Sequence, residues 1–426
     1  MNLNRKVLKY MRFPKIKKIY GIIRILIIIL LIFLVLSACN KTQTTEIPPA
    51  ETKKETEFDI EKIKQESIEA AALYKDLYLQ AEKTKSEYFP YRSELSQTDI
   101  DDIENLLISK GFSVINSDSK YPEYLENADG FYDFWNSTIL KEEAKFNVIS
   151  VTSTGGLFYT SFQYLNDTNY RISVTIEWND NNEPTVSSEE HGRILDWDLV
   201  NDTYFYYQIY MSGVSFDDYS LIRLKPVDKE LYDLNAKYIK PIGYASNNMF
   251  VSEWNYKDYG NLSFNDLLEP FYKIQNNDYF DDDAYPKIRE PYLHSYIPAA
   301  LFESTIMPYF DISLQEFRER CLYNREKDAY PWQQVCCENI TTYPVVESEV
   351  IKYQYNNDGT ITITVNARCN DYKTPCLFTH EVVIRIISDN EYYYLSNKIT
   401  YKGDYELPPN CPRLPPQRTV CNETEE

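Results

Sequence analysis

Glycine and histidine are scarce in this sequence, which contains 11 Gly and 3 His among 426 residues. Loops that bind nucleotide phosphates need glycines at fixed spacing, and neither GxGxxG nor GxxxxGKS/T occurs. GxSxG and CxxC are also missing, so neither a serine nucleophile elbow nor a zinc-binding cysteine pair is indicated. We therefore expect no nucleotide and no other cofactor.

The three histidines leave little room for acid–base catalysis. His380 and Glu381 look like the start of an HExxH zinc motif, but the fifth position holds Ile384 and the surrounding residues predict a strand, not a helix. We interpret His380 as a structural polar residue on one face of a sheet.

Basic residues are too few to balance the acidic ones, because 44 Lys and Arg stand against 65 Asp and Glu. Eight of the basic residues lie within the first 24 positions, and without them 36 remain against 65, a net charge of −29. Such a surface repels nucleic acid and anionic lipid headgroups, so no nucleic-acid partner is expected. Solubility is the favoured explanation, and attraction of cations or basic peptides is the alternative.

The basic start precedes an unbroken apolar run of twelve residues, Ile25 to Leu36. This run fits the core of a signal peptide and is shorter than the roughly 20 residues that span a bilayer. Leu36-Ser37-Ala38-Cys39 follows, and it resembles the lipobox of bacterial lipoproteins. The resemblance implies a signal peptide over residues 1–38, cleavage between Ala38 and Cys39, and a lipid on Cys39.

The expected location follows from that anchor. The mature protein would be attached to the cell membrane through its lipid and would lie on the extracytoplasmic face, and the composition suggests a Gram-positive source. An uncleaved signal anchor is the alternative, and it places the bulk of the chain on the same side.

Composition and periodicity divide the rest of the chain into five parts. A polar, Pro-containing stretch predicts a disordered stalk over residues 39–58, and a helical pattern capped by Asp59 predicts a spacer over 59–97. An N-terminal α+β domain over 98–228, a C-terminal domain over 229–404 and a Pro-rich tail over 405–426 complete the expected order.

The N-terminal domain is expected to combine helices with an antiparallel meander sheet. Helices are predicted at 98–110 and 123–138, and alternating patterns separated by turn residues predict strands at 146–152, 157–164, 170–178, 193–199, 204–211 and 219–224. The short links exclude parallel crossovers, which disfavours a periplasmic-type solute receptor.

The C-terminal domain is expected to place helices before a second antiparallel sheet. Helical patterns occupy 229–238, 263–276, 298–309 and 313–323, and strand patterns occupy 347–355, 360–367, 377–387 and 392–401. This order resembles the cone-shaped fold of nuclear-transport-factor-like proteins, which hosts both enzymes and scaffolds and so implies no function.

Seven cysteines remain beyond Cys39, all in the last quarter of the chain. Because an oxidising environment permits disulfides, Cys369 and Cys376 are predicted to bridge a hairpin around the loop NDYKTP. Cys411 with Cys421, and Cys321 with Cys336 or its neighbour Cys337, are the other candidate pairs. A zinc site is the disfavoured alternative, because the spacings are irregular.

Two groups of carboxylates are candidate sites, although clusters of this kind also arise by chance in an acidic chain. Asp196 and Asp198 would share a strand face at a spacing that glycoside hydrolysis permits. Asp278, Asp281 and Asp283 offer oxygen ligands for calcium, without the order of an EF-hand loop. In both cases a solvated acidic segment is the favoured interpretation.

An aromatic run, Tyr204 to Tyr207, could stack against sugars or peptides if exposed. Core packing with alternating exposure is the favoured interpretation for these four residues.

Three stretches resemble uncharacterised clostridial membrane lipoproteins that share a domain of unknown function. They are DIENLLISKGFSVINSDS, LNAKYIKPIGYASNNMFVSEW and CLFTHEVVIRIISDNEYYYLSNKITY. The resemblance implies no catalytic residues. We therefore expect a non-catalytic binding or envelope-assembly module with a cell-wall polymer or an envelope protein as partner, and a cell-wall glycoside hydrolase is the alternative.

Overall fold

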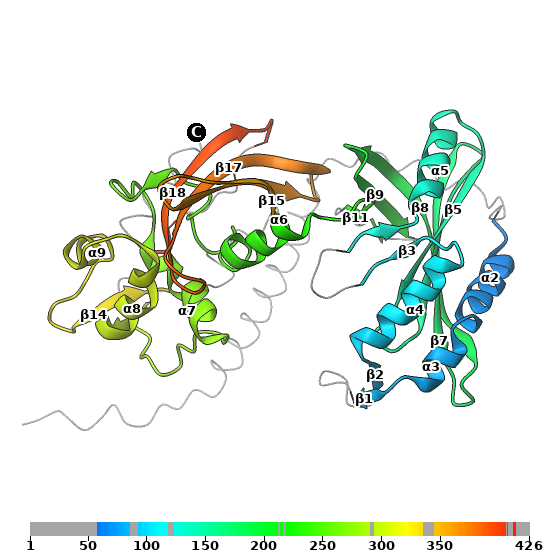
Figure 1. Ribbon diagram of the computed structural model, residues 1–426, viewed down its shortest axis with the longest axis horizontal. Helices are drawn as coiled ribbons and strands as arrows, with labels where there is room; N and C mark the ends of the chain where they lie inside the picture. Colours follow the sequence, from blue (N-terminus) through cyan, green and yellow to red (C-terminus); the bar gives the residue numbers. More distant parts are fainter. Residues whose placement is uncertain are drawn as a thin grey trace, which may run out of the picture. The chain divides into compact units, whose positions relative to one another are not determined.

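The computed structural model describes residues 58–85, 93–117, 123–211, 214–215, 219–289, 294–334, 345–405, 407 and 412–414. The predicted signal peptide, Ala38, Cys39 and the stalk up to residue 57 lie outside these residues, as do Cys336, Cys337, Cys411 and Cys421. Phe58, the last residue of the predicted stalk, is buried. Asp59–Glu426 group into one unit. Figure 1 shows its helices and strands. Within the described part, no helix has both the length and the hydropathy needed to cross a bilayer.

The helices that begin at Ile60 and Asp129 are shorter than the sequence pattern predicts, whereas the helix before Gly111 has the predicted length. Asp59 caps the first of them as expected, because its side chain accepts a hydrogen bond of 3.0 Å from the Lys62 amide. Ser96 caps the helix that ends before Gly111, through a 3.2 Å hydrogen bond from the Asp99 amide. The helices are α2 (Ile60–Ala72), α3 (Lys75–Gln80), α4 (Gln97–Ser109) and α5 (Asp129–Ile139), and a small hairpin of β1 (Lys83–Lys85) and β2 (Ser93–Leu95) separates α3 from α4.

The first large sheet has nine strands, in the order β10-β9-β8-β7-β6-β5-β3-β4, with β11 also paired to β9. β5 to β9 form the predicted antiparallel meander, while β3 pairs with β5 in parallel, so the sheet is mixed. The strands are β3 (Val114–Ile115), β4 (Leu125–Glu126), β5 (Ala144–Val151), β6 (Leu157–Leu165), β7 (Thr168–Trp178), β8 (Pro184–Val200), β9 (Tyr204–Met211), β10 (Val214–Ser215) and β11 (Ser220–Arg223).

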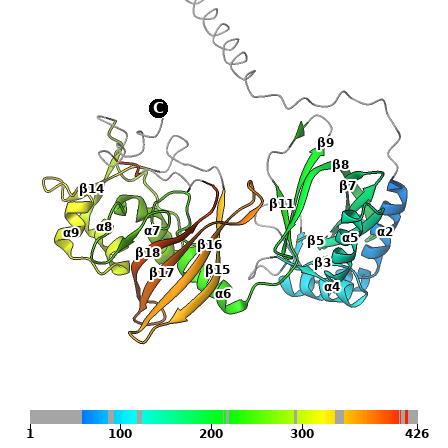
Figure 2. The ribbon, with the colours of Figure 1, turned by 90° about the horizontal axis from the view of Figure 1, so that it is seen from above.

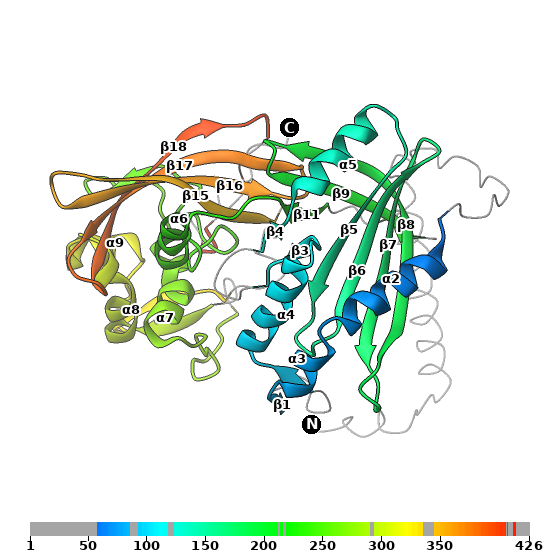
Figure 3. The ribbon, with the colours of Figure 1, turned by 45° about the vertical axis from the view of Figure 1, so that its right-hand side comes forward.

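Helices cover both faces of this sheet. Phe146 and Phe162 are cross-strand neighbours on β5 and β6, and both belong to the core that includes Phe131 of α5. Tyr159 points to the opposite face, where its hydroxyl donates a 3.2 Å bond to Glu66 of α2. Figure 3 shows α2 lying across β7 and β8. This double coverage explains why the strands carry apolar residues on both faces.

The second half is built as predicted, from helices followed by an antiparallel sheet in the order β12-β18-β17-β16-β15. The helical elements are α6 (Lys229–Leu234), the π-helix η2 (Asn235–Ile239), the 3₁₀ turns η3 (Phe264–Leu267) and η4 (Met307–Tyr309), α7 (Leu268–Asn276), α8 (Ala299–Ile306) and α9 (Leu314–Arg320). The strands are β12 (Trp254–Asn255), β15 (Val346–Tyr355), β16 (Thr360–Cys369), β17 (Thr374–Ile386) and β18 (Tyr392–Lys402), and a separate pair consists of β13 (Ser295–Pro298) and β14 (Ala329–Trp332).

Alternation along β16 assigns one face of this sheet to the core. Ile361, Ile363 and Val365 are fully buried and belong to a single cluster with Phe271 of α7 and Phe302 of α8. Figure 2 shows α7, α8 and α9 on one side of β15 to β18. The α+β class with two mainly antiparallel sheets is therefore confirmed, and the likeness to the nuclear-transport-factor-like cone remains a comparison of architecture.

A buried arginine fixes the chain near its C-terminal end. The Arg413 guanidinium donates to Asp266 Oδ1 at 3.0 Å, to Glu269 at 2.7 Å and to the Gln333 carbonyl at 2.7 Å. The side chains of Arg413 and Asp266 are each 2% exposed. With the Asp266 carbonyl, at 3.1 Å, four acceptors compensate a charge that would be costly to bury alone.

Replacing Arg413 tests that compensation. Arg413→Ala leaves Asp266 buried without its counter-charge, so we expect the free energy of unfolding in urea to fall by about 3–5 kcal/mol. Lys229→Ala is the matched control, because the ion pair between Lys229 and Asp233 is 71% and 56% exposed and should contribute little. A loss no larger than that of the control would show that Arg413 does not hold the segment.

Candidate binding site

The two carboxylates considered for glycoside hydrolysis have different surroundings. Asp196 is half-buried on β8 and accepts hydrogen bonds from the Tyr219 hydroxyl, at 2.7 Å, and from Lys373. Desolvation opposes its ionisation, but the bonds from Lys373 and Tyr219 outweigh this and hold the pKa of Asp196 below its ordinary value. Asp198 is exposed. Asp196 is therefore an ion-paired carboxylate and not a candidate proton donor at neutral pH.

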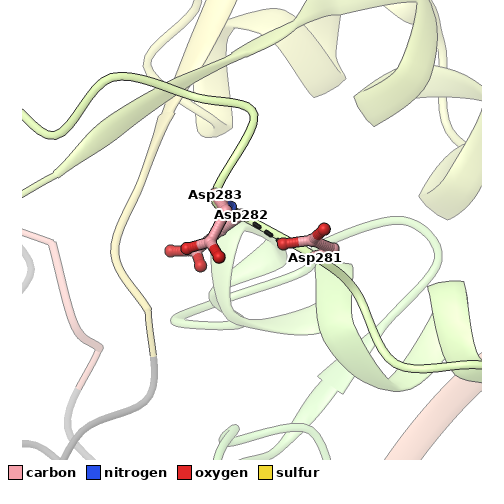
Figure 4. Close-up of side chains that lie close together, drawn as sticks. All are labelled: Asp281, Asp282 and Asp283. Atoms are coloured by element: carbon pink, nitrogen blue, oxygen red, sulfur yellow. Dashed lines mark hydrogen bonds between the residues drawn. The ribbon is translucent and has the colours of Figure 1, made fainter.

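The residues proposed for calcium gather only in part. Asp281, Asp282 and Asp283 each bring a carboxylate oxygen within 4.8 Å of the others, and Asp278 is not in this group. Figure 4 shows these three side chains, with the Asp281 carboxylate accepting a 2.9 Å bond from the Asp283 amide. The buried member, Asp282, is paired with Lys287, which already supplies a positive charge there.

The predicted disulfide between Cys369 and Cys376 is not formed, since both cysteines are free, as is Cys321. Ala367 lies opposite Phe378, and a regular continuation would place Cys369 opposite Cys376. A register shift after Ala367 instead places Cys369 opposite Thr374. The bulge therefore prevents Cys369 and Cys376 from lying opposite each other, which the length of the loop between them had predicted.

The aromatic run on β9 is buried throughout and so offers no exposed stacking surface. Phe205 and Tyr207 belong to the core of the first sheet. Tyr204 and Tyr206 point to the other face, towards arginines: Tyr204 contacts Arg223, and Tyr206 lies against Arg368. Core packing is confirmed because all four residues are buried, but the expected alternation of exposure is absent. Tyr204 and Tyr206 lie behind two arginines that line a polar cleft.

This cleft has a volume of about 600 Å³, which is within the range of small-molecule sites. Its walls come from β11, from α6 and the segment after it, and from β15 and β16. The lining residues are Glu123, Tyr219, Ser220, Leu221, Arg223, Val227, Tyr232, Asn235, Lys240, Gly243, Tyr244, Val346, Glu347, Ser348, Glu349, Val350, Arg368 and Asn370.

Arg223 and Glu349 form the best-connected contact in the wall. Two guanidinium nitrogens of Arg223 donate to the two oxygens of Glu349, at 2.8 and 3.0 Å, and its Nε donates to the Lys225 carbonyl. The Tyr204 hydroxyl donates to Glu349 at 2.9 Å. Burial, and then the charge of Glu349, raise the pKa of Tyr204 to about 12, so its hydroxyl remains a donor.

Arg368 occupies the bulge at the end of β16 and is also paired with a glutamate, although Glu347 is 56% exposed. It donates to Glu347 on β15 and, at 3.1 Å, to Asn370. Burial lowers the pKa of Arg368 from its ordinary value, and an arginine side chain stays protonated in proteins. Both arginines of the cleft therefore reach it already bound to a carboxylate.

Asn235 lines the cleft and contains a buried acceptor that no protein group uses. It is the first residue of the π-helix η2, where the Lys240 amide donates to the Asn235 carbonyl five residues earlier. Its side-chain nitrogen donates to the Ser348 carbonyl at 3.0 Å, while its Oδ1 is buried without a protein partner. Single π turns are frequent at functional sites, since they reorient one side chain.

Tyr244 connects the cleft to His380 in the core. Asn397 donates through Nδ2 to the carbonyls of Phe250 and Ser252, so its Oδ1 must accept from His380 Nδ1, at 2.7 Å. Nε2 then accepts from the Tyr244 hydroxyl, at 2.9 Å. Burial lowers the pKa of His380 to about 4. The interpretation of His380 as a structural polar residue agrees with this environment.

Comparison with protein families gives one result. Residues 60–413 match the model of a family of unknown function, DUF6070. The chain belongs to the DUF6070 family. No curated protein and no solved structure matches it. The expected membership of a family of unknown function is thus confirmed, while lipidation and the bacterial source stay predictions.

Sequence reasoning missed the cleft of this DUF6070 member. Arg223, Asn235, Glu349 and Arg368 are separated by up to 145 positions and carry no local motif. The only local signal was the segment LNAKYIKPIGYASNNMFVSEW, which supplies Asn235, Lys240, Gly243 and Tyr244 to the wall.

The buried histidine predicts a specific pH dependence. A free histidine titrates near 6.5 and His380 near 4, so the unfolded state binds the proton first as pH falls. Stability is therefore complete above pH 6.5, and about 3 kcal/mol is lost by pH 4. Urea titrations from pH 7.5 to 4 should show this loss in wild type and in His191→Gln, whose side chain is exposed. In His380→Gln the loss of unfolding free energy should be smaller by about 3 kcal/mol. The same dependence of unfolding free energy on pH in all three proteins would contradict the low pKa of His380.

Proposed function

We propose that this protein is a lipid-anchored binding protein of the bacterial cell envelope that holds a cell-wall polymer in the cleft beside β11, η2 and β15. The observation that carries the proposal is the closed pairing of Arg223 with Glu349 and of Arg368 with Glu347. Side chains fixed by such pairs present a preformed surface, which reduces the entropy lost on binding.

The same pairs favour binding over hydrolysis. A glycoside hydrolase needs one carboxylic acid that is protonated at working pH and a second carboxylate across the sugar ring. Glu349 accepts three hydrogen bonds from Arg223 and Tyr204, and Asp196 is held ionised by Lys373 and Tyr219. Neither residue is placed to serve as the acid.

Anchoring is supported by the charge, apolar run and lipobox of residues 1–39. Cys39→Ala removes the acceptor thiol, so labelled palmitate should no longer be incorporated. Cell fractionation and fluorography measure this, with Cys376→Ala as a control that keeps the label. Unchanged labelling of Cys39→Ala would exclude Cys39 as the lipid site.

Binding is tested by retention of the soluble chain from Asn40 on purified peptidoglycan. Ser220 is exposed at the cleft, so Ser220→Trp should block it and reduce retention at least tenfold. Ser109→Trp, on an exposed helix end outside the cleft, should bind like wild type. Release of soluble wall fragments that ceases in Asp196→Asn or Asp198→Asn would support the hydrolase alternative instead.

A further inference from the structure

Arg368 is a mostly buried positive charge that the protein compensates only in part. Its side chain is 15% exposed, whereas that of its charged partner, Glu347, is 56% exposed. A second hydrogen bond joins Arg368 to Asn370, whose side chain is neutral. Water can compete for Glu347, and an ion pair with so exposed a partner contributes little to stability. The guanidinium group of Arg368 therefore retains capacity for another negative group.

Two other mostly buried arginines, Arg223 and Arg413, are compensated more completely. Arg223 is bonded to both oxygens of Glu349, and Arg413 is bonded to Asp266, which is as deeply buried as the arginine. Burial opposes the protonation of both arginines, but their carboxylate partners outweigh it and raise the pKa of each. In Arg368 burial is not outweighed, and the nearby charge of Arg223 also lowers its pKa. Arg368 thus differs from both in lacking a buried carboxylate.

Lys240 adds a second cation to the same cleft. It follows η2 directly, is exposed, and forms no ion pair with any residue that the structure describes. Of the acidic residues in the wall, Glu349 is already bonded to Arg223. Glu123 and Glu347 are exposed, so water and salt screen their charges. The cleft can therefore attract a negative group although the whole chain has a net charge of −21.

We propose that the cleft binds an anionic group of the wall polymer, a carboxylate or a phosphate, which competes with Glu347 for Arg368 and is also held by Lys240. Guanidinium groups bind both kinds of anion through two parallel hydrogen bonds, and an ammonium group binds them as a point charge. The exposed Glu347 can leave Arg368 and remain solvated in water. The inference rests on the proposed function and adds the charge of the ligand and the residues that recognise it.

Substitutions of the three charged residues test this competition through the affinity of the soluble chain for purified peptidoglycan. Arg368→Gln removes a charge-assisted hydrogen bond and should weaken binding about tenfold. Lys240→Gln, at an exposed position, should weaken it about threefold. Glu347→Gln removes the competing carboxylate and should strengthen binding about threefold, a gain that loss of structure would not produce. Lys237→Gln is the matched control, because Lys237 is exposed on the same π-helix but does not line the cleft.

The source of the negative charge is identified by treating the peptidoglycan with hydrofluoric acid, which removes polymers attached through phosphate. Binding that survives this treatment and still responds to Lys240→Gln would assign a carboxylate of the peptidoglycan. Binding that the treatment removes would assign a phosphate. Unchanged affinity in Lys240→Gln and Arg368→Gln, or weaker binding by Glu347→Gln, would overturn the anionic assignment.

Calorimetry with free trisaccharides separates this inference from the proposed function. Wild type should bind the galacturonate trimer, which has carboxylates, at least tenfold more tightly than chitotriose, which has the same length and no charge. Equal binding of the two would overturn the inference. Preference for galacturonate without retention on peptidoglycan would support anion recognition and overturn the wall-polymer assignment. Retention that Ser220→Trp abolishes but the charge substitutions leave unchanged would keep wall binding and overturn anion recognition.

Discussion

The contact between Arg223 and Glu349 is the constraint on which the cleft depends. It joins the last strand of the first sheet, β11, to the edge strand of the second, β15, and Tyr204 of β9 completes it. Both side chains are largely withdrawn from water, at 13% and 16% exposure. Removing either partner would leave the other charge buried and uncompensated. Both sheets therefore depend on the same ion pair where β11 meets β15.

The strongly acidic composition makes these pairs informative. Acidic residues outnumber basic ones by 21, so most carboxylates must remain in water, where they are well solvated. The few buried positive charges are matched individually, Arg413 by Asp266 and Glu269, and Arg223 by Glu349. Buried pairs of this kind add little net stability, but they penalise any arrangement that separates them. They therefore specify position more than they stabilise the fold.

Sequence patterns predicted the regular parts of the fold well for a physical reason. Strands of the second sheet such as β16 alternate between buried and half-buried positions, and the turns contain residues that tolerate positive φ, such as Asn166 at 48° and Asn201 at 55°. Strand alternation and turn residues can both be recognised from residues that are close together in the sequence. The spacer helix was predicted too long because its pattern continues past Ala72, whereas the chain turns so that Tyr74 can donate to the Gly155 carbonyl. That contact spans 81 positions and has no local signature.

Irregular backbone explains why the candidate site could not be predicted in the same way. Register shifts lie next to Asp196 on β8, next to Glu349 on β15 and at Arg368 on β16, and η2 replaces the end of α6 at Asn235. A bulge turns a side chain to a new direction without changing the alternation of residue types, so the sequence pattern looks regular. The same bulge that turns Arg368 into the cleft moves Cys369 away from Cys376. Other shifts occur elsewhere in both sheets, so a bulge alone does not mark a site. The two bulges of β15 and β16, a π turn and the paired arginines together mark this cleft.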